Sequence, residues 1–127
     1  MRKLLIAFVP ALLFAACSGH DHGAASDHPL GGMWVQDTGS EAKGFGLQFN
    51  TKGTDCDLHT APRADGTHDH EHGSYTFDAT TKAVTVTCKL LGPGKAEAWA
   101  GTLGVGVLEL TGGADKVTLK PGKIAGH

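Results

Sequence analysis

Apolar residues occupy every second position in several short segments of the chain, which is the spacing of β-strands that bury one face. In the clearest case, Val84, Val86 and Cys88 alternate with Thr85 and Thr87. Similar alternation is found at residues 45–49, 56–58, 75–77, 108–110 and 117–119. The pattern therefore predicts short strands joined by turns, and it requires no helix.

Turn-forming residues separate these segments and predict tight connections between the strands. They are Asn50-Thr51-Lys52-Gly53, Asp78-Ala79-Thr80-Thr81, Gly92-Pro93-Gly94 and Gly112-Gly113. With further strands at Trp34 and Trp99, the count reaches about eight, which is enough to hide the strand edges by closing into a barrel. We predict one all-β domain over residues 30–121, either a small antiparallel up-and-down β-barrel or a compact β-sandwich.

The composition agrees with a single small β domain. The chain has 127 residues, of which 40% are apolar, so it has room for one hydrophobic core. Its 19 glycines, set among many valine, threonine and leucine residues, favour strands with tight turns over long helices.

The first segment of the chain looks like an export signal. Arg2 and Lys3 are positive, the apolar run after them is too short for an ordinary membrane-spanning helix, and small residues precede Cys17. Leu13-Phe14-Ala15-Ala16-Cys17 resembles the lipobox of bacterial lipoproteins. The resemblance implies that residues 1–16 are a signal peptide and that Cys17 is acylated. A plain secretory signal cleaved nearby, or an uncleaved anchor, is the alternative.

An acylated Cys17 would hold the protein to a membrane of the bacterial cell envelope. Ser18 stands where many inner-membrane lipoproteins carry aspartate, so the resemblance implies the outer membrane, with the domain facing the periplasm. We expect residues 17–29 to be the acylated cysteine and a flexible, histidine-containing tether, and residues 122–127 to be a C-terminal tail.

The charge balance argues against two classes of partner. Removal of Arg2 and Lys3 with the signal leaves 9 basic and 13 acidic side chains, a formal charge of −4 with neutral histidines. Such a chain is not basic enough to hold nucleic acid, and charge alone would not attach it to anionic lipid. Contact with the membrane is therefore expected through the lipid anchor, and the sequence names no protein partner.

A second resemblance concerns the fold. Gly32-Met33-Trp34, at the head of the first predicted strand, resembles the G-x-W opening of lipocalins, and residues 31–120 are similar to the small lipocalin-like domains of bacterial lipoproteins. The resemblance implies that the tryptophan packs across one end of a barrel against a basic residue of the last strand, either Lys116 or Lys120. Because the chain is shorter than a full lipocalin, we expect a filled barrel rather than a roomy cup.

Cys56 and Cys88 remain once Cys17 is assigned to the lipid. In an oxidising compartment a pair of cysteines is more often a disulfide than a metal site, so we predict a disulfide between them. A simple meander opposes this bond, because the strand of Tyr75 would hold the two residues about 9 to 10 Å apart, and a disulfide needs Cα atoms within about 7 Å. Reduced, buried thiols are the alternative.

The most distinctive polar segment is the run His68-Asp69-His70-Glu71-His72, which lies in a loop longer than a hairpin requires. In an extended chain the three histidines project to one side, and a bend would bring two or three of them to one metal ion. Asp69 or Glu71 would then be a further oxygen ligand or a hydrogen-bond partner of a ligating histidine.

Other histidines extend this candidate metal site. His59, at the end of the preceding strand, could complete it, as could His20 and His22 of the tether. Imidazole ligands suit Zn²⁺, Cu²⁺ or Ni²⁺, whereas Ca²⁺ and Mg²⁺ prefer oxygen. Protons compete for the same nitrogens, so the metal should be released as pH falls through the histidine range near about 6.5.

Three other interpretations stay open. The histidine run could be an inert polar loop, and the domain could be a structural or interaction module of the envelope. A carrier of a small apolar ligand would need an internal cavity of at least about 300 Å³, which the aromatic residues of the interior are expected to fill. No nucleophile motif surrounds Ser74, so we do not expect an enzyme.

Overall fold

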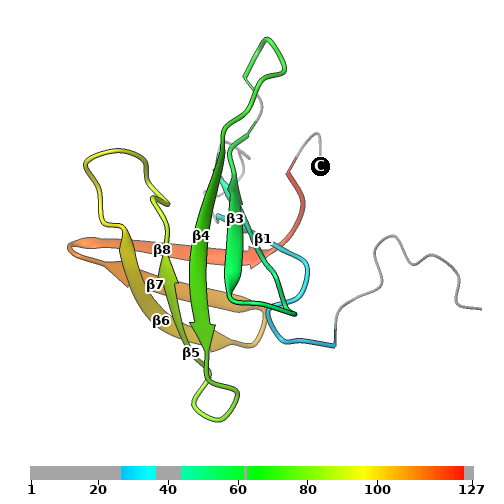
Figure 1. Ribbon diagram of the computed structural model, residues 1–127, viewed down its shortest axis with the longest axis vertical. Coiled ribbons are helices and arrows are strands. Elements are labelled where there is room, and N and C mark those ends of the chain that lie inside the picture. The colour runs from blue at the N-terminus through cyan, green and yellow to red at the C-terminus, as the bar shows by residue number, and fades with distance from the viewer. Residues whose placement is uncertain (1–26, 37–43, 62, 125–127) are drawn as a thin grey trace, which may run out of the picture.

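The computed structural model describes residues 27–36, 44–61 and 63–124, whose eight strands form one closed antiparallel barrel (Figure 1). Each strand pairs with the next along the chain, and the last strand pairs with the first. The strands are β1 (Met33–Gln36), β2 (Gly46–Phe49), β3 (Asp55–His59), β4 (His70–Phe77), β5 (Ala83–Thr87), β6 (Ala98–Gly104), β7 (Val107–Gly112) and β8 (Asp115–Pro121). The predicted up-and-down barrel is confirmed, and the sandwich alternative is excluded.

Strand alternation decides which side chains fill the barrel. In β5, Val84 and Val86 are buried, whereas Ala83, Thr85 and Thr87 are exposed. The interior is filled by large apolar side chains, which include Trp34, Phe45, Leu47, Phe49, Leu58, Tyr75, Trp99, Leu108, Leu110, Val117 and Leu119. No polar or charged side chain of the described residues is buried. The filled interior agrees with the prediction made from the length of the chain.

Two strand boundaries differ from the predicted ones. β4 begins at His70, so the second half of the histidine run belongs to a strand, because β3 and β4 pair as far as His59 and His70. Cross-strand hydrogen bonds here outweigh the weak strand propensity of charged residues. β5 ends at Thr87, one residue before Cys88. The amide of Cys88 instead donates to the carbonyl of Glu97 at 2.8 Å, and the thiol stays buried.

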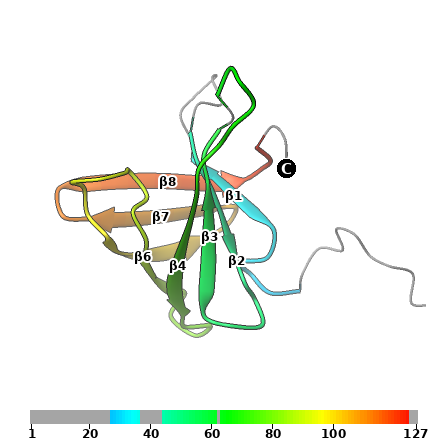
Figure 2. The same cartoon turned by 45° about the horizontal axis from the view of Figure 1, so that its top comes forward.

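The two ends of the barrel differ, as Figures 1 and 2 show. At one end, the arm end, the connection between β3 and β4 rises beyond the barrel; its described residues, 60–61 and 63–69, are called the arm. The opposite end, the tether end, holds residues 27–32 and the turn between β6 and β7 at Val105. There the buried Trp34 donates its Nε1–H to the carbonyl of Leu30 at 3.2 Å.

The predicted signal peptide and lipid anchor fall outside the described residues. This applies to residues 1–16, to Cys17, His20 and His22 within residues 17–26, and to residues 125–127 of the tail. Within the ranges that the structure describes, no helix has the length and apolar character needed to cross a membrane.

Candidate metal centre

The pairing of β3 with β4 sorts the histidine run onto two sides of the sheet. His59 lies opposite His70, and Asp57 lies opposite His72. All four occupy alternate positions of their strands, so their side chains share the outer face of the barrel. Glu71 lies between His70 and His72 in sequence and therefore faces inward. The prediction that the histidines project to one side is confirmed for the two that lie in β4.

His59 and His70 face each other across β3 and β4. The amide of Thr60 donates to the carbonyl of Asp69 at 3.0 Å, which makes the neighbouring pair, His59 and His70, a non-hydrogen-bonded pair of the ladder. Side chains approach more closely in such pairs than in hydrogen-bonded ones. The two imidazole centroids are 4.5 Å apart, with the ring planes at 80°.

His68 extends this contact to three imidazoles, which we call the histidine row: His59, His70 and His68. The ring centroids of His68 and His70 are 4.4 Å apart, and their Nε2 atoms are separated by 2.5 Å. In such a contact one nitrogen donates a proton and the other accepts it. Two imidazole nitrogens therefore point at each other, with a third ring beside them.

Hydrogen bonds within the arm hold His68 in this position. The amide of Asp69 donates to the hydroxyl of Thr60 at 2.8 Å, and the amide of Arg63 donates to the carbonyl of Thr67 at 2.7 Å. The Arg63 guanidinium pairs with the Asp69 carboxylate and holds the pKa of that carboxyl below its ordinary value, chiefly through the hydrogen bond. Asp69, predicted as an oxygen ligand, is thus engaged within the arm.

His72 has a different partner from the rest of the run. Its Nδ1 contacts the carboxylate of Asp57 on β3, and its side chain is 86% exposed. Sequence reasoning did not single out Asp57. Its position two residues before His59 on one strand was the available signal, because residues at that spacing share a face.

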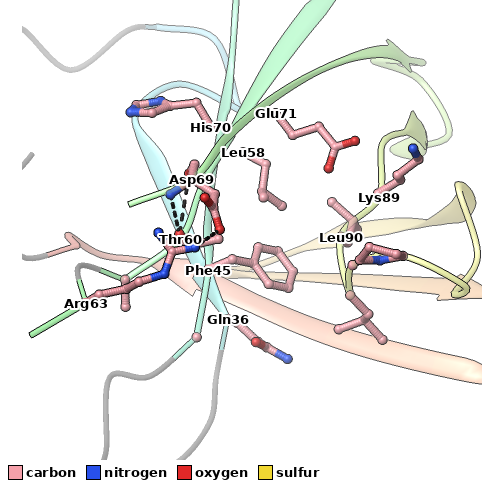
Figure 3. A pocket seen from close by; sticks show the side chains of 15 residues that line it. Gln36, Phe45, Leu58, Thr60, Arg63, Asp69, His70, Glu71, Lys89 and Leu90 are labelled. Atoms are coloured by element: carbon pink, nitrogen blue, oxygen red, sulfur yellow. Dashed lines mark hydrogen bonds and ion pairs between the residues drawn. The ribbon is translucent and has the colours of Figure 1, made fainter. Parts of the chain in front are cut away.

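Glu71 points into a cavity at the arm end of the barrel (Figure 3). The cavity has a volume of about 550 Å³, and apolar side chains such as Phe45, Leu58 and Leu90 line it. Figure 3 shows the side chains of Glu71 and Lys89 on one side of the cavity, whereas the ring of His70, which also lines the cavity, points to the other side. Glu71 is therefore on the opposite side of the sheet from the histidine row and does not belong to the same site.

The histidine row offers imidazole nitrogens, but it is not spaced to hold a metal ion as it stands. Two nitrogens bound to one tetrahedral ion at about 2.1 Å lie roughly 3.4 Å apart, so the 2.5 Å between the Nε2 atoms of His68 and His70 must widen. Among the described residues, no group of three or more His, Cys, Asp or Glu side chains is already arranged to hold a metal ion. Neutral imidazoles suit Zn²⁺, Cu²⁺ and Ni²⁺.

Cys56 and Cys88 are free, buried thiols, and the predicted disulfide is absent from the structure. They flank Gly73 of β4: a Cβ placed on this glycine would lie 3.2 Å from Cys56 Sγ and 2.8 Å from Cys88 Cβ. The intervening strand sets the two Cα atoms roughly 9.6 Å apart, beyond the reach of a disulfide. Burial raises the pKa of Cys56 to about 12 and that of Cys88 to about 11.

Comparisons of the chain with protein families, with curated proteins and with solved structures gave no match. The geometry of the described residues is therefore the basis for a function.

Proposed function

We propose that this protein is an envelope lipoprotein that binds Zn²⁺, Cu²⁺ or Ni²⁺ through His59, His68 and His70. The observation that carries the proposal is the histidine row itself. Two Nε2 atoms face each other at 2.5 Å, and the ring of His59 lies against His70 from the neighbouring strand. A metal ion would replace the proton that now lies between the two nitrogens, as expected when protons and metal compete for imidazole.

The position of the row favours reversible binding over a structural role. Structural zinc sites are closed by four protein ligands, whereas three imidazoles leave a position for water or an exchanging ligand. His70 is exposed, and His59 and His68 are only partly buried. The barrel core contains none of the three, so the fold does not depend on the metal. These features suit buffering or transfer of metal in the periplasm.

Calorimetric titration of the mature protein, residues 17–127, with Zn²⁺ tests this proposal. We expect a dissociation constant in the micromolar range or tighter, and a loss of at least tenfold in affinity in the His70→Ala variant, because it removes the central ring of the row. His72→Ala is the matched control, since it removes an exposed histidine of the same strand outside the row; its affinity should stay within threefold.

Equal zinc affinity in the wild type and in a His59→Ala/His68→Ala/His70→Ala variant would refute the site. Repeating the titration with His20→Ala/His22→Ala measures any contribution of the tether. Cu²⁺ and Ni²⁺, titrated in the same way, establish the preferred ion.

Acylation of Cys17 is the second part of the proposal. It is supported by the lipobox-like sequence and by the small residues before the cysteine. Intact-mass spectrometry of the protein from its own membranes should give a chain that starts at Cys17 and carries acyl groups. A Cys17→Ser variant should accumulate unprocessed, and an unmodified cysteine in the native protein would rule out the anchor.

The cavity at the arm end supports a second candidate function, the binding of a small, largely apolar ligand. Its volume of about 550 Å³ lies within the range of small-molecule sites, roughly 300 to 1,000 Å³, and Phe45, Leu58 and Leu90 provide apolar contact. The filled interior places such a ligand above the core rather than inside it. Fluorescence titration with an apolar probe should show binding that Leu91→Glu, at a partly buried position of the cavity lining, abolishes; an unchanged affinity would dismiss it.

A further inference from the structure

The tether end of the barrel presents apolar side chains to solvent. Val105, at the tip of the turn between β6 and β7, is the one fully exposed large hydrophobic residue in the described part of the chain. Beside it lies a groove of about 560 Å³, lined by Pro29, Leu103 and Pro121 among others. A single exposed valine is ordinary, but Val105 and the groove together form a continuous apolar surface, the kind of feature that marks an interaction site.

A second hollow, of about 370 Å³, continues this surface. It shares Gly31 and Pro121 with the groove and is also lined by Met33. Lys82 lines the groove, and Lys123 lines the second hollow. An apolar centre with cations at its margin matches the boundary of a phospholipid bilayer, where acyl chains meet phosphate groups.

A hydrogen bond holds the backbone of Lys82 beside the strand that leads into the apolar turn. The amide of Leu103 donates to the carbonyl of Lys82 at 2.9 Å, which ties the turn between β4 and β5 to the end of β6. The ammonium group of Lys82 lies 5.9 Å from the centre of the Phe77 ring. The charge and the exposed valine are thus presented at the same end of the barrel.

The course of the chain favours the bilayer as the occupant of this surface. His28 and Pro29, close to the first described residue, line the groove. Ten residues, 17–26, connect Cys17 to this point, and ten residues reach at most about 36 Å when fully extended. A lipid on Cys17 would therefore keep this end close to the membrane. The contact between the tether end and the bilayer then becomes effectively intramolecular, so that even a small apolar surface is sufficient for docking.

We propose that the tether end is a docking surface for the phospholipid bilayer, with Val105 inserted at the acyl boundary and Lys82 and Lys123 beside headgroup phosphates. The inference rests on the acylation of Cys17 proposed above. Docking of the tether end would orient the barrel relative to the membrane, because the histidine row lies at the opposite end of the barrel. β4 alone, from His70 to Phe77, covers about 23 Å. The row would thus face the periplasmic solution, from which it takes up metal.

The test supplies the anchor chemically, so that its outcome does not depend on processing in the cell. All eight strands lie within residues 33–121, so a chain of residues 17–127 contains the whole barrel. Its Cys17 is coupled to a maleimide lipid in nanodiscs of phosphatidylethanolamine and phosphatidylglycerol; the other two cysteines are buried and stay unlabelled. A fraction of the lipid carries a nitroxide, and amide signal intensities are measured by NMR.

Docking predicts that the amides of Val105 and Gly106 lose at least twofold more intensity than that of Asp65 in the arm. Val105→Asp should remove this difference, whereas Thr111→Asp, an exposed position on the side of the barrel, should preserve it. Equal losses at both ends, or the greater loss at the arm, would overturn the proposal. Zinc affinity should be unchanged in Val105→Asp, which checks that the barrel is intact. Failure of acylation would be seen only in the mass of the native protein.

Discussion

On the inner face of β3 and β4, Cys56, Leu58 and Tyr75 have exposures of 0%, 4% and 6%, whereas on the outer face His70 and His72 are exposed. Both sets come from the same two strands, and neighbouring residues alternate between them. The inner residues of the core are limited by volume, because large apolar side chains pack together in the barrel interior. The choice of side chain on the outer face is limited only by the cross-strand neighbours that it contacts.

This contrast separates stability from metal binding within one hairpin. A change on the inner face should alter the free energy of unfolding, whereas a change on the outer face should alter ligand affinity and leave the fold intact. The histidine row can therefore be varied without endangering the barrel. Four experiments test whether stability and metal binding are separated in this way, and each could reveal a different exception.

The largest effect is expected at Gly73, on the inner face. A Cβ atom there would lie 2.4 Å from the backbone carbonyl of Thr87 and 2.8 Å from the Cβ of Cys88. Gly73→Val should destabilise the protein by about 3 kcal/mol or more, since overpacking forces the backbone to move. Ser74→Val, the next residue but on the outer face, should change stability by less than about 0.5 kcal/mol. Urea denaturation measures both, and similar losses would show that the two faces are not separate.

The next effect concerns the metal as a stabilising ligand. Zinc at 100 times its dissociation constant should raise the free energy of unfolding by about 2.7 kcal/mol, because it binds only the folded chain. At the same zinc concentration, His70→Ala should lose at least about half of this gain, because its affinity is at least tenfold lower. Without metal its stability should lie within about 0.5 kcal/mol of the wild type. His72→Ala should retain the gain. A large loss of stability in metal-free His70→Ala would show that the outer face also supports the fold.

Much of this architecture was predictable from the sequence. The alternation of Val84 and Val86 with threonines indicates a strand with one buried face, and repetition of such segments between turns indicates an antiparallel barrel or sandwich. The histidines at every second position likewise predict that their side chains project to one side of the strand. These inferences succeed because a period of two is a local property of the chain.

The remaining features depend on how strands align, which alternation does not determine. The partner of His70 is His59 because the arm has the length that brings these two residues opposite each other; a different loop would pair His59 with another residue. The disulfide prediction was wrong for the same kind of reason. Compartment chemistry favours a bond between Cys56 and Cys88, but the backbone of Gly73 lies between them.

The thiols provide the third experiment, a dependence of stability on alkaline pH. Burial raises the pKa of Cys56 to about 12 and of Cys88 to about 11, from an ordinary value of 9.0. Above pH 9 the unfolded chain therefore loses protons that the folded chain keeps, so the free energy of unfolding falls as pH rises. The slope should be at most about 1.4 kcal/mol per pH unit for each thiol, up to pH 11 for Cys88.

The Cys56→Ala/Cys88→Ala variant isolates this contribution. It is less stable at neutral pH, but its stability should decline less steeply between pH 9 and 10.5 than that of the wild type. Burial, the largest cause of the raised pKa of Tyr75, is shared by both proteins, whereas the smaller contribution of Cys56 is lost in the variant. Parallel declines would mean that the thiols reach solvent in the folded barrel.

The smallest effect is expected at Asp57, which pairs with His72 on the outer face. The side chain of Asp57 is 39% exposed and that of His72 86% exposed, so water and salt screen their attraction. Asp57→Asn, which keeps an oxygen able to accept a hydrogen bond, should change the free energy of unfolding by less than about 0.5 kcal/mol. Zinc affinity should stay within threefold, because the pair lies outside the histidine row. A tenfold loss of affinity in calorimetry would extend the metal site along the strands to include Asp57, and the division between ligands and neighbouring surface would have to be redrawn.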